Sequence, residues 1–173
     1  MRNGKTVFVD CNDTLIAVRH ASRSDVVPDG FKSIERGGQW YHVQARPSAD
    51  AFLKAVAAEA CNIVVLTGGS SRIQHLLLAL TDLDEELDQV IGFESSGRVE
   101  LPASWVLVDD LQGGCSSFEE KLAMLGFKRK DIGEARYKAL VEKHCIQCRS
   151  FKGGDDSAPL TGLLEEVRTK LAA

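Results

Sequence analysis

Apolar residues occur in short continuous runs along the chain, and each run ends in polar residues. Runs that are apolar at consecutive positions are typical of strands covered on both faces of a sheet. The strands predicted in this way cover residues 5–10, 63–66, 90–93, 105–108 and 145–151.

Between these runs, apolar residues recur at helical spacing. The predicted helices begin at Pro47 and after Gly69, form a pair within residues 116–143, and end the chain at residues 157–171. Strands that alternate with helices predict an α/β fold, in which helices cover a parallel sheet to give three layers.

A hairpin insert, over about residues 17–46, follows the first strand. Its first part, residues 17–30, is polar and ends in a turn signal. Two β-favouring runs at 31–35 and 39–45 then flank Arg36-Gly37-Gly38, and this pattern predicts an antiparallel hairpin.

A second insert, helical and rich in charge, covers about residues 111–144. The sequence contains no internal repeat, low-complexity segment or linker. We therefore predict a single domain over residues 1–173, with no large cap domain above its sheet.

Composition and charge exclude several classes of partner. The chain has 173 residues, a formal net charge of −4 and a pI of about 5.6. This balance argues against nucleic acid and against an acidic membrane surface as partners. No stretch approaches the length of a transmembrane helix. Five cysteines occur without an export signal, so we expect reduced thiols in a cytoplasmic protein.

Two groups of side chains have more than one interpretation. Trp40, Tyr41 and His42 on the hairpin either line a substrate groove or pack the hairpin against the sheet. Cys145 and Cys148 have the spacing of half a zinc site, but structural zinc takes four ligands and no second Cys-x-x-Cys exists. We interpret these cysteines, and also Cys11, as core residues.

Three of the predicted strands end in polar residues that should lie together at one edge of the sheet. They end in Asp10, Thr67 and the pair Asp109-Asp110. Ligands bind at the carboxyl ends of strands in an open parallel sheet, and carboxylate oxygens suit Mg²⁺. Gly68 and Gly69 precede a helix and leave room for an anion near backbone N–H groups. Metal, phosphate and a carboxylate nucleophile together indicate phosphoryl transfer through an aspartyl intermediate.

These residues resemble the motifs of the haloacid dehalogenase (HAD) superfamily of aspartate-nucleophile hydrolases. The family's Asp-x-Asp-x-Thr motif stands here as Asp10-Cys11-Asn12-Asp13-Thr14, its strand-end Ser or Thr as Thr67, and its paired acids as Asp109-Asp110. Three motifs in order on three predicted strands are a far stronger signal than any one of them.

Within the superfamily the chain is most similar to the small C-terminal-domain (CTD) phosphatase branch. The stretch "YHVQARPSADAFL" resembles the branch's passage from its insert hairpin through Arg-Pro into a helix. The tail "CIQCRSFKGGDDSAPLTGLL" resembles its last strand, Gly-Asp loop and final helix. Residues 111–144 depart from the branch.

The resemblance implies a role for each matching residue. Asp10 is expected to be the nucleophile, and the backbone carbonyl of Asn12 is expected to bind Mg²⁺ together with Asp10. Thr67 is expected to hydrogen-bond the phosphoryl group, and Asp109 or Asp110 to hold the metal. Thr14, Gly68, Gly69 and Arg72 are the further expected substrate contacts.

Two positions depart from the family pattern. The family's second aspartate is its general acid, and Asn12 cannot donate or accept that proton. Asp13 is a weak substitute, because one residue further along its side chain should point elsewhere. The family's charge-balancing lysine is also missing, since no lysine lies between Lys54 and Lys121. Arg98 is the best positional replacement and Arg72 the second.

These observations support two main hypotheses. The first is a Mg²⁺-dependent phosphatase, slowed or specialised by Asn12, that acts on a phosphorylated small molecule or a phosphoprotein. The second is a catalytically inactive protein that binds a phosphorylated partner or assembles with another protein. Dehalogenase-type chemistry, whose leaving group needs no proton, ranks last because those members generally carry a cap.

Overall fold

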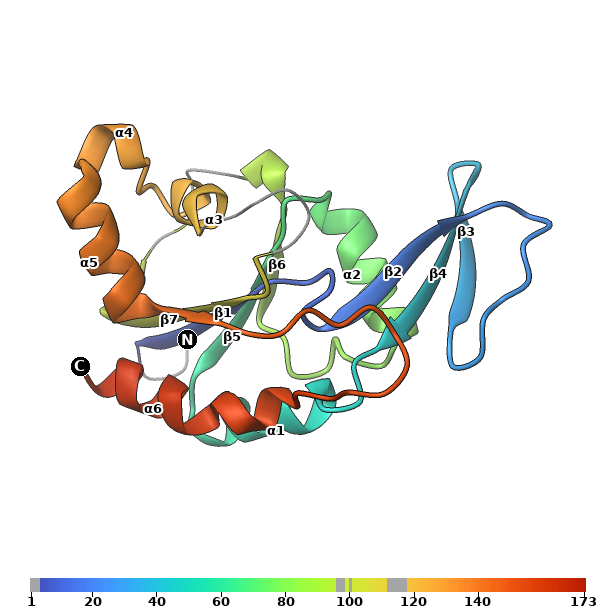
Figure 1. Ribbon diagram of the computed structural model, residues 1–173. Helices are drawn as coiled ribbons and strands as arrows, with labels where there is room; N and C mark the ends of the chain where they lie inside the picture. Colours follow the sequence, from blue (N-terminus) through green and yellow to red (C-terminus); the bar gives the residue numbers. More distant parts are fainter. Residues whose placement is uncertain (1–3, 96–98, 100, 112–117) are drawn as a thin grey trace.

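A five-stranded parallel sheet forms the centre of the computed structural model, which describes residues 4–95, 99, 101–111 and 118–173 (Figure 1). Its strands are, in spatial order, β6 (Gln89–Ile91), β5 (Asn62–Leu66), β1 (Lys5–Val9), β7 (Ser104–Asp109) and β8 (Cys145–Gln147). All four neighbouring pairs are parallel. The predicted α/β class, with a parallel sheet between layers of helices, is therefore confirmed.

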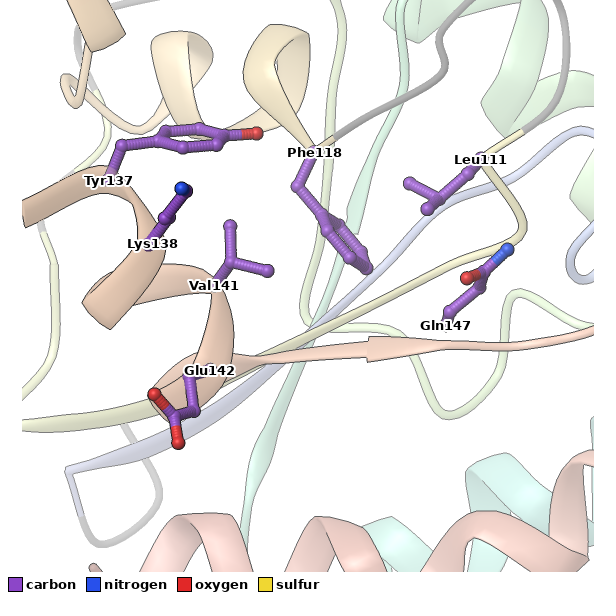
Figure 2. Close-up of a pocket in the computed structure, with 7 residues that line it drawn as sticks. All are labelled: Leu111, Phe118, Tyr137, Lys138, Val141, Glu142 and Gln147. Atoms are coloured by element: carbon purple, nitrogen blue, oxygen red, sulfur yellow. The ribbon is translucent and has the colours of Figure 1, made fainter. Parts of the chain in front are cut away.

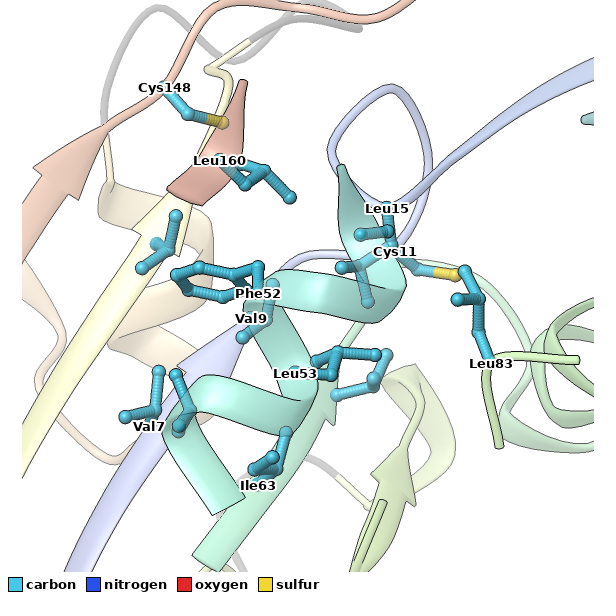
Figure 3. Packing of buried hydrophobic residues seen from close by; sticks show 14 of the residues in the cluster. Val7, Val9, Cys11, Leu15, Phe52, Leu53, Ile63, Leu83, Cys148 and Leu160 are labelled. Atoms are coloured by element: carbon cyan, nitrogen blue, oxygen red, sulfur yellow. The ribbon is translucent and has the colours of Figure 1, made fainter. Parts of the chain in front are cut away.

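The sheet is covered on both faces because its strands are apolar at successive positions. Val7 and Val9 point to one face, where they pack with Phe52 and Leu53 in the larger buried cluster (Figure 3). Phe8 belongs to a second buried cluster on the opposite side. Side chains that alternate across a strand thus give the molecule two hydrophobic layers.

The helices divide between these two layers. The larger cluster draws its helical residues from α1 (Ala49–Ala58), α2 (Ser71–Leu80) and α6 (Leu164–Ala172), and α1 and α6 lie side by side in Figure 1. The second cluster contains Phe118 and residues of α3 (Glu119–Met124) and α5 (Glu134–His144). Among the described residues, no helix is both long enough and apolar enough to cross a lipid bilayer.

The helical insert differs in detail from the predicted pair of helices. Residues 118–144 form three helices, with the short α4 (Arg129–Ile132) between α3 and α5. Gly126 and Gly133 have φ angles of +93° and +78° and lie where α3 and α4 end. Such left-handed positions end helices and favour glycine.

The last strand and last helix are shorter than predicted. β8 ends at Gln147, and the 3₁₀ turn η2 (Leu160–Leu163) precedes α6. The segment between β8 and η2 is irregular and is held by the side chain of Arg46. Arg46 donates hydrogen bonds to the carbonyl oxygens of Arg149 and Ala158. These carbonyl oxygens accept hydrogen bonds from a side chain distant in sequence and not from a strand or helix. The spacing of apolar residues gives no sign of such contacts, so the sequence predicted regular elements there.

A small antiparallel sheet replaces the expected isolated hairpin. The hairpin itself is confirmed: β3 (Lys32–Arg36) pairs with β4 (Gln39–Ala45) across a turn whose Gly37 and Gly38 have φ angles of +62° and +81°. A third strand, β2 (Ile16–Ala21), pairs along the other edge of β4. Its outer half is polar and exposed, so the sequence alone did not indicate a strand there.

The small sheet is packed onto the larger one by residues of β4. His42 is 4% exposed, and Tyr41 packs against the larger buried cluster and lies 5.2 Å from the His20 ring. The packing interpretation is therefore correct for Tyr41, while His42 is buried and Trp40 is half-buried.

Candidate active site

The site is centred on Asp10, directly after the middle strand of the parallel sheet. Val9 is paired with Val65 of β5 on one side and with Val108 of β7 on the other. The backbone N–H of Asp10 continues this ladder by donating to the Val108 carbonyl oxygen at 2.9 Å. The ends of β5 and β7 therefore lie on either side of Asp10, as the sequence predicted.

Asp10, Asp109 and Asp110 form a buried acidic cluster at this edge. Each offers a carboxylate oxygen, and these oxygens lie within 4.8 Å of one another. Asp109 accepts the Leu111 backbone N–H at 2.8 Å, and Asp110 accepts the Thr14 hydroxyl at 3.4 Å. The second oxygen of Asp110 is buried and has no hydrogen-bond partner among the described residues.

Lys121 is the cation that meets Asp10. Its ammonium group forms an ion pair with the Asp10 carboxylate and donates to the Leu66 carbonyl oxygen at 3.0 Å. The lysine lies on α3, within the predicted helical insert and after Asp109-Asp110 in the chain. The family's motif order predicts a cation ahead of those acids, so Lys121 is not among the residues that the sequence indicated. One signal was present: Lys121 shares a helical spacing with Phe118, Leu122 and Leu125, which are all buried.

Neither of the two arginines expected in this role is seen beside Asp10 in the part of the chain that the structure describes. Arg98 lies outside the described residues. Arg72 is exposed on α2, and among the described residues no hydrogen bond or ion pair links it to Asp10. Lys121 is the cation that the described residues bring to Asp10, and the roles of Arg98 and Arg72 stay predictions.

Burial and charge shift the pKa values of this pair. Burial raises the pKa of Asp10 to about 7, against the opposing pull of Lys121, and the neighbouring Asp109 adds to the rise. Burial by itself would lower the pKa of Lys121, but the Asp10 carboxylate outweighs it and the pKa is raised. Lys121 therefore stays charged at neutral pH, and Asp10 depends on nearby positive charge to remain a carboxylate.

The cluster fits a divalent cation. Fully ionised, three carboxylates and one ammonium leave a formal charge of −2 in a buried place. Such charge is unfavourable without compensation, and one Asp110 oxygen has no partner in the described part of the chain. Mg²⁺ prefers oxygen ligands and carries the charge required.

Thr67 and the two glycines form the adjoining loop at the end of β5. Thr67 is buried, and its hydroxyl oxygen accepts the Gly69 backbone N–H at 3.1 Å. A side chain at Gly68 would meet Glu120, because a Cβ there would lie 2.7 Å from the Glu120 Oε1. A Cβ at Gly69 would lie 2.8 Å from the side-chain nitrogen of Gln74. Both glycines thus let other side chains approach the loop closely.

Asn12 and Asp13 lie on the turn that follows Asp10, and their side chains have different surroundings. The Cys11 carbonyl oxygen accepts two backbone N–H groups, from Leu15 at 2.9 Å and Ile16 at 3.1 Å. Asn12 is exposed on this turn. Asp13 has a φ angle of +62°, and its carboxylate forms an ion pair with Lys152. Its side chain therefore points to the C-terminal loop, as expected for a residue one position too far along.

Thr14 lies beside the acidic cluster. Its side chain is fully buried and links Asp110 to Cys148, whose thiol donates to the Thr14 hydroxyl oxygen at 3.8 Å. In this position Thr14 orients a predicted metal ligand, and its contact with substrate stays a prediction.

Three cysteines near the site are embedded in the core. Burial raises the pKa of Cys145 to about 12 and that of Cys148 to about 11, and burial also raises the pKa of Cys11 well above its usual range. All three thiols are protonated at neutral pH, and a protonated thiol is a poor nucleophile and metal ligand.

An apolar pocket lies beside the acidic cluster. It has a volume of about 400 Å³, and Figure 2 shows Tyr137 and Val141 of α5 on one side and Phe118 and Leu111 on the other. Leu111 directly follows Asp110, but no predicted site residue of the described ranges lines the pocket.

Comparisons with known proteins agree with this geometry. Residues 5–111 match the family described as NLI interacting factor-like phosphatase. No significant match is found among curated proteins.

Two solved structures share the fold. One is the fission yeast RNA polymerase II CTD phosphatase Fcp1-R271A bound to beryllium fluoride, with a TM-score of 0.51, 15% identity, and coverage of 96% of this chain and 50% of that one. The other is Fcp1, described as an essential RNA polymerase II CTD phosphatase, with a TM-score of 0.52 and 16% identity. This match covers 96% of the present chain and 48% of the Fcp1 chain. The chain thus spans about half the length of these structures.

The family match includes Asp10, Thr67 and the Asp109-Asp110 pair, and it covers more than half of the chain. The predicted HAD-type phosphatase of the CTD-phosphatase-like branch is confirmed at the level of family. The chain belongs to the NLI interacting factor-like phosphatase family.

Proposed function

We propose that this protein is a Mg²⁺-dependent phosphomonoesterase. Asp10 becomes phosphorylated, and the resulting aspartyl phosphate is then hydrolysed to restore the free carboxylate. The observation that carries the proposal is the buried Asp10 carboxylate, held between the Lys121 ammonium and the Asp109-Asp110 pair. A nucleophile, a fixed cation and two further oxygen ligands at one sheet edge are the parts that phosphoryl transfer through a carboxylate requires.

Each residue has a distinct role in this proposal. An oxygen of Asp10 attacks phosphorus, and the ester oxygen departs. Lys121 keeps Asp10 ionised and offsets the charge that collects on the phosphoryl oxygens. The Thr67 hydroxyl and the Gly68-Gly69 backbone bind those oxygens. Asp10, Asp109, Asp110 and the Asn12 carbonyl would hold Mg²⁺, which neutralises phosphoryl charge when bound.

Asn12 restricts the substrates. Positioned general acid–base catalysis contributes about 10²–10⁴-fold in rate, and an amide side chain supplies none of it. We therefore expect faster turnover of aryl phosphates, whose leaving groups need little protonation, than of alkyl phosphates.

A phosphoprotein is the substrate class that we favour over a small molecule. The family's description and the two Fcp1 structures, each described as a CTD phosphatase, support this choice. The absence of a large cap over the described residues also supports it, because an uncovered site can admit a macromolecule.

The second candidate function is binding of a phosphorylated partner without turnover. The replacement of the general acid by Asn12 is the specific observation in its favour. The acidic cluster and Lys121 would then act as a binding site alone.

Turnover of p-nitrophenyl phosphate separates the two functions. We would measure it with and without Mg²⁺ for the wild type, Asn12→Asp and Asp10→Asn. A phosphatase predicts slow Mg²⁺-dependent turnover by the wild type, faster turnover by Asn12→Asp and none by Asp10→Asn. If the folded wild type and Asn12→Asp are both inert, the enzymatic proposal is wrong and binding of a phosphopeptide should be measured instead.

Binding of Mg²⁺ can be tested without any substrate. A ligand that binds only the folded state at 100 times its Kd stabilises that state by about 2.7 kcal/mol. We expect saturating Mg²⁺ to raise the midpoint of thermal unfolding of the wild type. Asp110→Asn should remove most of this shift, whereas Glu85→Gln, the same change of charge at an exposed residue of the α2–β6 connection, should retain it. Equal shifts in all three proteins would contradict a site at Asp110.

A further inference from the structure

We infer that Glu120 is the general acid and base of this site, in place of the aspartate that Asn12 replaces. The inference rests on the proposed phosphatase function. It follows from α3, which brings two consecutive charged residues to one edge of the sheet: Lys121 meets Asp10, and Glu120 meets Gly68.

The Glu120 carboxylate lies against the loop that is expected to hold the phosphoryl group. A Cβ on Gly68 would approach the Glu120 Oε1 to 2.7 Å, closer than real Cβ contacts allow. Gly68 directly follows Thr67, so the carboxylate is within one residue of the predicted phosphoryl contact. In the mechanism that we infer, the ester oxygen leaves on the side of the phosphoryl group that faces this carboxylate.

The helix gives the two residues different surroundings. Consecutive residues of an α-helix are separated by about 100° around its axis. Lys121 is 9% exposed and points into the acidic cluster, whereas Glu120 is exposed at its rim. A general acid must exchange its proton with water between turnovers, and an exposed carboxyl can do so.

Other carboxyl groups around this edge point elsewhere. Asp13 pairs with Lys152 of the C-terminal loop, and Glu94 accepts the Ser71 backbone N–H at the start of α2. Glu119, one residue before Glu120, pairs with Arg129 at 3.2 Å.

The proton balance requires no further reactant. In the first step Asp10 forms a bond to phosphorus, the bond from phosphorus to the ester oxygen breaks, and the Glu120 carboxyl gives its proton to that oxygen. In the second step the Glu120 carboxylate takes a proton from water as the water oxygen attacks phosphorus. Asp10 is released as a carboxylate, inorganic phosphate forms, and Glu120 is again protonated.

The test compares Glu120→Gln with the wild type on two phosphate esters. With glycerol phosphate, whose alkoxide needs a proton to leave, we expect turnover to fall by about 10²-fold or more. With p-nitrophenyl phosphate, the first equivalent of p-nitrophenolate should still be released at the wild-type rate in a rapid-quench experiment. Later turnovers should slow, and phosphorylated enzyme should accumulate because water is no longer activated.

Two further variants make the comparison specific. Glu119→Gln removes the same charge from the same helical turn and should leave both substrates nearly unaffected. In an Asn12→Asp background the aspartate supplies the proton, so adding Glu120→Gln should have little effect on glycerol phosphate.

Several results would overturn the inference. Equal losses on both substrates, or the same losses in Glu119→Gln, would mean that Glu120 acts only on structure or local charge. Wild-type turnover of p-nitrophenyl phosphate without any turnover of glycerol phosphate would overturn the inference and leave the proposed function intact. A wild type that turns over neither ester would refute both.

Discussion

At Asp10, two physical effects act in opposite directions. Removal from water raises the pKa of the carboxyl to about 7, whereas the adjoining Lys121 favours the charged form that a nucleophile requires. A buried ammonium can serve here because its attraction to Asp10 exceeds its own desolvation, and its pKa is raised. The ionisation of Asp10 therefore depends on a residue that lies 111 positions away in the chain.

We predict that Lys121 is the essential cation of the site. Lys121→Gln should lower turnover of p-nitrophenyl phosphate by about 10²–10³-fold, the usual effect of removing one group that stabilises transition-state charge. Arg72→Gln, which removes an exposed cation from α2, should have little effect. The measurement is steady-state turnover in saturating Mg²⁺, which also offsets the unpaired charge that Lys121→Gln leaves on Asp10.

The reverse order, with a large loss for Arg72→Gln and a small one for Lys121→Gln, would contradict this assignment. Lys121→Arg is a useful third variant, because it retains the charge but not the compact geometry of the ammonium.

At the scale of elements, Arg46 joins the start of α1 to the C-terminal loop. Its guanidinium pairs with Asp156 at 3.0 Å, and the two side chains are 1% and 6% exposed. It also donates to the carbonyl oxygen of Thr14 at 3.2 Å, in the turn that follows Asp10. Ser48 donates to the same Asp156 and accepts the Leu160 backbone N–H at 2.8 Å. This network holds the Asp10 turn and the last helix in fixed relation.

We predict that Arg46→Met destabilises the protein strongly. Removing one partner of a buried ion pair typically costs about 3–5 kcal/mol, because the other charge is left uncompensated. Arg168→Met is the matched control: Arg168 pairs with Glu59 at 2.6 Å, but its side chain is 49% exposed, and such surface pairs contribute about 0–1 kcal/mol. Urea unfolding measures both free energies, and similar losses for the two variants would contradict the prediction.

At the scale of the whole molecule, the end of α5 packs against the central sheet through an aromatic contact. The His144 ring stacks on Trp105 of β7 at 4.1 Å, with an angle of 8° between the rings. Its Nδ1 lies 2.9 Å from the Trp105 carbonyl oxygen, which only accepts, so this nitrogen carries the hydrogen. Burial lowers the pKa of His144 below its usual value.

This shift makes stability depend on pH. The unfolded chain binds a proton at His144 near pH 6.5, whereas the folded protein binds it only at lower pH. Between these values the unfolded state holds more protons at His144, so the contribution of this residue to the free energy of unfolding falls as pH drops below about 6.5. Asp10, whose pKa is raised to about 7 in the folded protein, contributes with the opposite sign, so the test compares variants at His144. We predict that His144→Gln weakens this dependence, whereas His75→Gln, at an exposed position of α2, leaves it unchanged.

Urea unfolding at a series of pH values from neutral to mildly acidic measures this difference. The comparison uses the slope of the unfolding free energy with pH, because the loss of the stacking contact lowers the stability of His144→Gln at every pH. Parallel curves for the wild type and His144→Gln would show that this histidine is not the titrating group.

The central sheet and its chemical edge were determined by local sequence. Continuous apolar runs such as Val7–Val9 require burial on both faces, and only a parallel sheet between helices provides it. The residues that end these runs therefore share one edge wherever the intervening segments lie. Asp10, Thr67 and Asp109-Asp110 could be assigned to one site for that reason. Asp13 was correctly expected to point away, since one step along the chain redirects a side chain.

Other features depended on contacts between distant segments and left no periodic signal. β2 is held by pairing with β4, and the tail around Ala158 by the buried guanidinium of Arg46. Lys121 and Glu120 reach the site only because α3 packs against the sheet on the side of Phe8 and Leu107. Motif order placed the missing lysine before Asp109. In a folded protein a charge acts through space and not through its position in the chain, so only the tertiary structure could identify the cation of this site.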